Sequence, residues 1–332
     1  MKRKYLIIGS LSFAHFFAKA QSVSDTDSIK VKKTEIEMVY NHYLQNGNNS
    51  AVTGGIGTEK LTVYGPALAL RNVSGKNAFT LEMGADVISS ASTDNIDFVV
   101  SSASVRDIRT YMNSSYSRQL DKQRLQLNAG LGLSVESDYL SLSGSLGIIK
   151  KNKNLQRTLS ANIQFYKDDL RWGRLNPDYY RPVGLIYPSE LRYKAWFDVY
   201  TRYSYNLKIG ITQIMNKRNT LGIFPEFSYQ RGLLSTPFHR VYFNNDYLAV
   251  EKLPASRLKG AIALKLNSFV GGRVVLKNAI HGYTDNFGIH SMAFENETAI
   301  KLRPYFTLLP NIRIYSQGGS DYFARYKEHQ FD

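Results

Sequence analysis

Apolar residues recur at every second position through most of this chain. Phe79, Leu81 and Met83, for example, are separated by Thr80 and Glu82. An alternation with a period of two gives a β-strand one apolar and one polar face. The polar positions hold mostly small or neutral residues (Gly, Ser, Asn and Gln), which suits a water-filled interior better than a second packed face. The alternative is a large soluble β-sandwich with aromatic core positions.

The alternation predicts about thirteen long strands. They lie near 34–45, 59–71, 78–90, 106–119, 123–135, 139–150, 155–167, 198–215, 219–231, 255–270, 273–283, 288–302 and 305–316. Most are far longer than the roughly 5–6 residues usual in globular proteins. They match or exceed the ~9–11 residues of a tilted strand that crosses a bilayer.

The connections alternate in length along the chain. Tight turns are predicted at 151–154, 216–219 and 271–272. The long loops are predicted at 46–58, 91–105, 168–197 and 232–254. Short turns at one end and long loops at the other are typical of an outer-membrane barrel, and closure removes exposed strand edges. We therefore predict an all-β fold, an antiparallel transmembrane outer-membrane β-barrel over 34–332.

Aromatic residues are abundant, with 23 Tyr and 17 Phe. Many fall near predicted strand ends, where barrels carry aromatic girdles at the membrane interfaces. Those tyrosines are Tyr40, Tyr43, Tyr200, Tyr203, Tyr205, Tyr229, Tyr283 and Tyr315.

The N-terminus predicts export. A basic start is followed by an apolar run, Tyr5–Phe17, and by a small-residue cleavage site ending at Ala20. We expect a signal peptide over 1–20 and a short polar segment over 21–33. The expected localisation is the cell outer membrane. The chain has no cysteine, which excludes a lipid-anchored lipoprotein, a thiol nucleophile, disulfides and thiolate metal sites.

The chain is basic, with a formal net charge of +15. Without Lys2, Arg3, Lys4 and Lys19 of the signal peptide, 38 Lys and Arg remain against 27 Asp and Glu, a net charge of +11. These cations are scattered rather than clustered, so we expect no nucleic-acid partner. Anionic lipopolysaccharide of the outer-membrane lipid, or anionic solutes, are the expected partners.

Known enzyme motifs are not found in the sequence. The glycine-rich stretch 46–61, NGNNSAVTGGIGTEKL, lacks the lysine and the following helix of a phosphate-binding loop, so we interpret it as a turn. No G-x-S-x-G elbow and no H-E-x-x-H pair occurs. We predict that the protein is not an enzyme, with an outer-membrane hydrolase held in reserve.

One loop has the composition of a calcium site. Asp94, Asp97 and Asp107 lie among many hydroxyl residues, and Glu136 and Asp138 are predicted nearby. Calcium binds six to eight hard oxygen ligands. The alternative is a solvated loop whose Ser and Asp side chains make local turns.

The loop 168–197 combines aromatic, cationic and proline residues. Loops this long are usually functional or disordered, and this composition argues against disorder. We predict a structural cap or a constriction. The alternatives are a loop that stacks on sugars and a loop that docks a surface lipoprotein. The candidate residues are Arg171, Trp172, Arg174, Tyr179, Tyr180 and Arg181.

Several stretches together resemble one outer-membrane family of Bacteroidota, catalogued as domain of unknown function 3570. They are GNNSAVTGGIGTEKL, ASTDNID with SSASVRDIR, SVESDYLSLS, QRGLLSTPFHRVYF, LPASRLKGAIALKLN, YTDNFGI and RIYSQGGSDYFARY. The resemblance implies a barrel without an assigned reaction, and an association with flavinyl transferase and thioredoxin-like partners. The chain stops at 327–332 in a predicted loop, and thirteen strands are an odd number, whereas bacterial barrels close with an even one. We therefore expect a C-terminally truncated chain and a complete barrel of about 16 strands.

Two functions are consistent with these features. The first is a passive, porin-like channel for small solutes, with a preference for anions because of the basic excess. The second is a non-conducting barrel that serves as a binding or scaffold partner for a surface or redox-linked assembly, with loops ordered by calcium. Small polar positions support an open lumen, namely Gly130, Gly132, Ser141, Ser143, Ser145, Asn162 and Gln164. An inward cluster of Arg202, Tyr203 and Tyr205 would support a plugged one.

Overall fold

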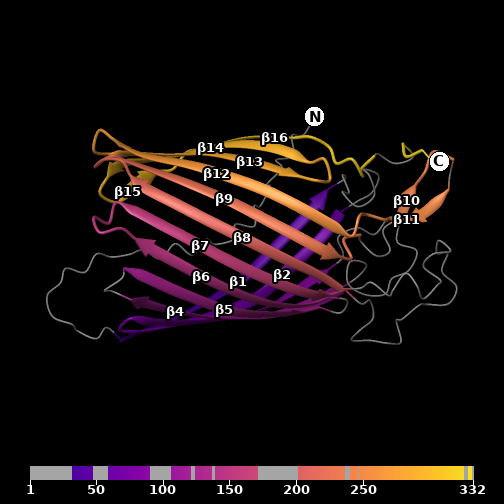
Figure 1. Cartoon of the computed structure of the whole chain (residues 1–332), viewed down its shortest axis with the longest axis horizontal. Coiled ribbons are helices and arrows are strands. Elements are labelled where there is room, and N and C mark those ends of the chain that lie inside the picture. The colour runs from indigo at the N-terminus through magenta and orange to yellow at the C-terminus, as the bar shows by residue number, and fades with distance from the viewer. Residues whose placement is uncertain are drawn as a thin grey trace.

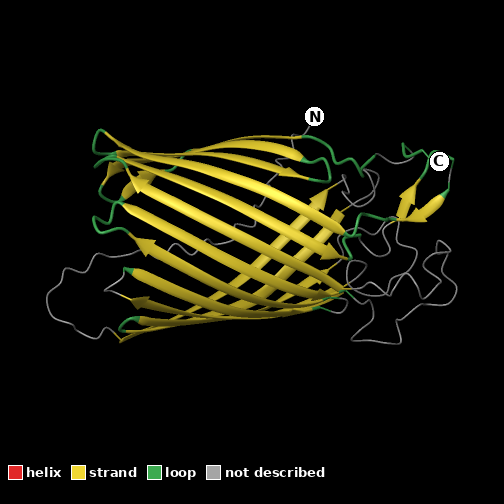
Figure 2. Cartoon of the chain, in the orientation of Figure 1, coloured by secondary structure: helices red, strands yellow, loops and turns green. Residues whose placement is uncertain are grey.

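The structure is a computed structural model. It describes residues 32–47, 59–89, 106–120, 124–136, 139–170, 201–235, 240–245, 247–324 and 328–330. Figure 2 shows strands and loops throughout this part of the chain. None of the described residues forms a helix long and apolar enough to cross a membrane.

Twelve long strands form the body of the molecule. They are β1 (Lys32–Gly47), β2 (Glu59–Ser74), β3 (Asn77–Ser89), β4 (Arg106–Leu120), β5 (Leu125–Val135), β6 (Leu140–Lys151), β7 (Arg157–Asp169), β8 (Thr201–Ile214), β9 (Asn219–Gly232), β12 (Ser256–Val270), β13 (Val274–Asp285) and β14 (His290–Arg303). The shorter strands are β10 (Arg240–Tyr242), β11 (Leu248–Val250), β15 (Phe306–Leu308) and β16 (Asn311–Gln317). The alternation of the sequence therefore placed every long strand to within a few residues.

All long strands belong to one 14-stranded sheet in which neighbours along the chain pair antiparallel. The order runs from β1 to β9 and continues through β12, β13 and β14, while β15 and β16 both pair with β14. The sheet curls, so that β1 and β2 pass behind the other strands with the opposite slope (Figure 1). In the described residues β1 and β16 do not pair with each other, so the curled sheet has two edges. The predicted all-β antiparallel fold is confirmed.

Two details differ from the prediction. The thirteenth predicted strand divides into β15 and β16 at 309–310, because Pro310 has no N–H to donate to β14. Both pieces keep one register along β14, from Leu308 opposite Ile300 to Asn311 opposite Glu297. The predicted loop 232–254 contains a hairpin of β10 and β11, two strands of three residues each. Such short strands are below the length at which an alternating pattern is recognisable.

The two ends of the sheet have different connections. At one end the turns are short, as at 75–76, 215–218 and 271–273, and Gly271 and Gly272 adopt the positive φ values that favour glycine. At the other end lie the β10–β11 hairpin and the turn 286–289 (Figure 1). We call this second end the rim. The predicted signal peptide, the segment 21–31 and most of the predicted loops 46–58, 91–105 and 168–197 lie outside the described residues.

The two faces of the sheet have inverted exposure. On the apolar face Leu131, Leu146 and Ile163 expose 71%, 69% and 59% of their surface. On the polar face Asp168 and Ser204 expose only 2% and 6%. Since a curled sheet shields its concave side, the polar face is the inner one and the apolar face is the outer one.

An aromatic row lies on the apolar face near the rim. The ring of Phe165 lies 6.2 Å from that of Tyr203 and 5.3 Å from that of Tyr205, and Tyr205 lies 6.4 Å from Tyr229. The suggested inward cluster of Arg202, Tyr203 and Tyr205 is therefore wrong. Side chains on successive strand residues point to opposite faces, so Arg202 lies on the polar face and the two tyrosines do not.

Three other tyrosines predicted for an aromatic girdle lie on the polar face, among them Tyr43, which donates a hydrogen bond to Gln45. Tyr283 donates a hydrogen bond to Asp285 there, and Tyr315 lies beside the guanidinium of Arg313.

Candidate functional site

The mid-strand polar positions of β3 to β7 form a surface that we call the neutral wall. Its side chains are hydroxyls and carboxamides that make no hydrogen bond with other residues that the structure describes. They are Thr80, Asn113, Ser115, Ser143, Ser145 and Gln164. The backbone ladder holds each strand in place without these side chains. Their donors and acceptors are therefore available to water or to a solute.

Glycines give the neutral wall its depth. A Cβ at Gly132 would lie 2.4 Å from Ser143 Oγ and 2.5 Å from Asn113 Oδ1, and one at Gly130 would lie 2.7 Å from Ser145 Oγ. The side-chain oxygens of Ser143, Asn113 and Ser145 therefore occupy the space that a Cβ would take at these glycines. The result is a hollow of about 230 Å³ on the polar face, lined by the neutral wall together with Glu82 and Tyr166.

The polar positions of β8 to β16 form a different surface, which we call the ion-paired wall. Lys208 Nζ lies 3.4 Å from Glu226 Oε1, and Lys277 pairs with Glu297. Glu295 lies 3.1 Å from Arg313 Nε. These charges face each other across neighbouring strands, so they satisfy one another rather than an external ligand.

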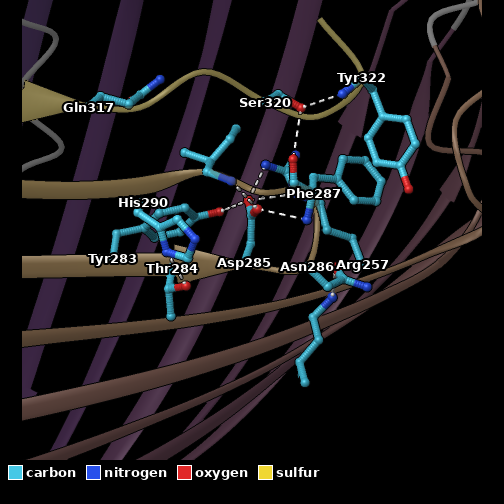
Figure 3. Close-up of polar contacts among 12 residues, drawn as sticks. Arg257, Tyr283, Thr284, Asp285, Asn286, Phe287, His290, Gln317, Ser320 and Tyr322 are labelled. Atoms are coloured by element: carbon cyan, nitrogen blue, oxygen red, sulfur yellow. Dashed lines mark hydrogen bonds and ion pairs between the residues drawn. The ribbon is translucent and has the colours of Figure 1, made fainter.

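The rim above the ion-paired wall is organised around Asp285 (Figure 3). This carboxylate is buried at the last residue of β13. Its Oδ2 accepts hydrogen bonds from Tyr283 (2.6 Å) and from Nε of Arg257 (3.0 Å), and Arg257 Nη2 also contacts it. Its Oδ1 accepts the backbone N–H groups of Phe287 (2.9 Å) and Ile289 (3.1 Å). One carboxylate thus joins β12, β13 and the following turn.

The pKa of Asp285 reflects these contacts. Burial by itself would raise the pKa of the carboxyl group. The hydrogen bonds from Tyr283, Arg257 and the two backbone N–H groups outweigh that effect and lower the pKa from 3.8 to about 2. Asp285 is therefore ionised and its bonds are intact across the physiological range.

The segment after β16 packs on the same turn. Phe287 is 3% exposed, and its ring lies against Tyr322 at 4.9 Å and under the guanidinium of Arg257 at 4.6 Å. The carbonyl of Phe287 accepts bonds from Ser320 Oγ (3.0 Å) and from the N–H of Asp321 (2.9 Å). We call this segment, 318–323, the strap, because it ties the end of β16 to the β13–β14 turn.

A second buried carboxylate lies at the rim on β7. Asp168 accepts a hydrogen bond from Ser141 Oγ at 2.7 Å and pairs with Nε of Arg202 at 2.8 Å. It joins β6, β7 and β8 as Asp285 joins β12 and β13. Both rim carboxylates are bonded to side chains of neighbouring strands. We call them fasteners, because each joins two or more strands at the rim.

The site residues predicted from sequence fall mainly where the structure gives no description. Asp94 and Asp97 lie outside the described residues. Asp107 is part of β4, but its side chain is not among those described. The constriction residues are outside the described part as well, namely Arg171, Trp172, Arg174, Tyr179, Tyr180 and Arg181. The calcium and constriction hypotheses therefore remain predictions.

A family model described as "Protein of unknown function (DUF3570)" matches residues 93–330, and the chain belongs to that family. The match covers every strand from β4 onward. No curated protein matches the chain.

Proposed function

We propose that this protein is an outer-membrane β-barrel that acts as a passive, porin-like channel for small solutes. The observation that carries the proposal is the inverted exposure of the sheet. Large aliphatic side chains cover its outer face, whereas polar side chains are shielded inside. Only a solvent that is itself apolar makes that arrangement favourable, because every exposed Leu or Ile would otherwise remain in water.

Other features of the sheet support the same proposal. Strands of 11 to 16 residues are long enough for a tilted crossing of a bilayer of ~30 Å. The aromatic row of Phe165, Tyr205 and Tyr229 lies on the apolar face near the rim, where interfacial girdles occur. The neutral wall supplies the polar interior that an aqueous channel requires. The proposal includes no catalytic role.

The channel is tested by reconstitution. The protein, expressed with its full reading frame, is purified from outer membranes, and its folded state is checked by heat-modifiable migration in detergent gels. In planar bilayers we expect steady single-channel openings. A heat-modifiable protein that gives no openings would contradict the proposal. The predicted preference for anions is read from the reversal potential in a salt gradient.

A second candidate is a non-conducting barrel that presents a docking surface. One observation favours it. The β10–β11 hairpin extends beyond the rim, and Phe243 of this hairpin pairs with His329, whose carbonyl accepts the N–H of Asn244 at 2.9 Å (Figure 1). A protein partner would then contact this unit. Deletion of 240–250 should abolish capture of a partner and leave any conductance unchanged.

A further inference from the structure

We propose that the hollow in the neutral wall is a binding site for a neutral, polyhydroxylated solute, with room for one sugar ring. The inference deepens the proposed channel function, on which it rests for the route by which the solute reaches the wall. The site lies mid-strand on β3 to β7, and its lining residue Tyr166 precedes the rim carboxylate Asp168 by two positions on β7.

The chemistry of the free groups defines the solute. Hydroxyls donate and accept, and carboxamides offer a donor and an acceptor on one flat group. Thr80, Asn113 and Gln164 combine both kinds in one hollow, and none of them is bonded to another described residue. A solute with several adjacent hydroxyls can match such an array, whereas an ion would find few formal charges to pair with.

Glu82 adds one acceptor of greater strength. It lines the hollow on β3 and forms no ion pair with any described residue. A carboxylate accepts hydrogen bonds from two neighbouring hydroxyls through its two oxygens, and such charge-assisted bonds are about twice as strong as neutral ones. Tyr166, which also lines the hollow, offers a ring against which the apolar face of a sugar can lie.

The volume of the hollow fits a ligand of the size of one sugar ring. Its volume of about 230 Å³ is below the range of roughly 300–1,000 Å³ typical of drug-sized ligands, and so suits a smaller molecule. Gly130 and Gly132 make the space, because a Cβ at either position would collide with Ser145 or Ser143.

A comparison with the ion-paired wall indicates where on the polar face a solute can bind. There, groups that would bind a solute are already bonded to neighbours, as in Lys208–Glu226 and Arg313–Glu295. A solute that bound there would have to displace these pairs, whereas at the neutral wall it displaces only water. The neutral wall is therefore where the interior can hold a polar solute.

Binding is tested by saturation-transfer NMR with glucose on the folded, detergent-solubilised protein, which needs no conductance. The test variant carries Thr80→Val and Asn113→Leu, two substitutions that keep shape and remove hydrogen bonds. The control variant carries Asn267→Leu, on the polar face of β12 and outside the hollow. Triethylene glycol serves as a neutral solute without a hydroxyl array. Heat-modifiable migration confirms that each variant is folded.

We expect saturable glucose binding that weakens at least tenfold in the double variant, since each lost hydrogen bond lowers affinity about fivefold. The control variant should bind within twofold of the wild type, and triethylene glycol should not saturate. No saturable binding to the folded wild type, or unchanged binding to the double variant, would overturn the inference. Conductance without glucose binding would retain the channel and reject this site. Binding without conductance would retain the site and reject the channel.

Discussion

The two halves of the polar face use the same sheet in opposite ways. In the middle of β3 to β7 most side chains of the polar face are small, neutral and not bonded to other described residues, as at Ser145 and Gln164. On β8 to β16 they are long and charged, and pairs such as Lys208–Glu226 join neighbouring strands. Antiparallel backbone ladders run through both halves, so the difference between the halves lies mainly in the side chains.

We infer from this difference that the ion-paired wall contributes to the stability of the sheet, whereas the neutral wall is available for contact with solutes. Because the ladders already satisfy the backbone, side chains on the neutral wall are not needed to hold strands together. Cross-strand ion pairs on the other half add to strand pairing and consume their own polar groups. We therefore expect substitutions in the ion-paired half to alter stability, and substitutions in the neutral half to alter solute contacts.

The largest effect is expected at Arg257. Arg257→Leu removes the charged partner of a buried carboxylate and should lower the free energy of unfolding by about 3 kcal/mol. Urea unfolding in lipid vesicles, followed by tryptophan fluorescence, measures the change. The double variant with Asp285→Asn should lose less, because no charge is then left unpaired and the carboxamide oxygen can still accept the N–H groups of Phe287 and Ile289. A single variant as stable as the wild type would refute the role of Asp285 as a fastener.

The rim should also depend on pH in one direction. The pKa of Asp285 is lowered in the folded state to about 2, from an ordinary 3.8. Its stabilisation is therefore fully present above about pH 4 and is lost as the pH falls through about 2. The difference in unfolding temperature between the wild type and Asp285→Asn should shrink over that window. A difference that stays constant from pH 6 to pH 2 would contradict this assignment.

A smaller effect is expected within the ion-paired wall. Lys277 and Glu297 are both half-exposed, so Lys277→Gln should lower the free energy of unfolding by about 0.5 kcal/mol. High salt should reduce the difference further, since it screens exposed charges. Loss of several kcal/mol would mean that this pair behaves like the rim fasteners.

The smallest effect on stability is expected in the neutral wall. Thr80→Val should change the free energy of unfolding by less than about 0.5 kcal/mol, because the hydroxyl makes no hydrogen bond with other described residues. The same urea titration provides the measurement. A clear loss of stability would show that the neutral wall also holds strands together, and would remove the contrast between the two halves.

The fold was predictable because a period of two is a local property of the chain. Alternation located β3, β5 and β7 and the small polar positions of the neutral wall without any knowledge of contacts. It does not show which residues near a strand end lie on which face, as the mistaken grouping of Arg202 with Tyr203 shows. Residues in succession on a strand point in opposite directions, whatever chemistry they share.

The Asp285 fastener was missed for a different reason. Arg257 is 28 residues from Asp285 along the chain, and the strap is more distant still. Such contacts depend on strand register, which a single sequence does not display. A local signal did exist, since Asp285 with Gly288 in T-D-N-F-G has the composition of an Asx-turn, and Gly288 adopts a positive φ of 81°.

The central claim is that the polar face lines an aqueous pore and the apolar face contacts lipid. The chain has no cysteine, so single cysteines can be placed at two successive positions of β6, Ser145→Cys on the polar face and Leu146→Cys on the apolar face. Single-channel current is recorded in a planar bilayer while a charged, membrane-impermeant thiol reagent is added. We predict a stepwise fall in current for Ser145→Cys and no change for Leu146→Cys. The reverse result, or modification of Leu146→Cys alone, would contradict the account.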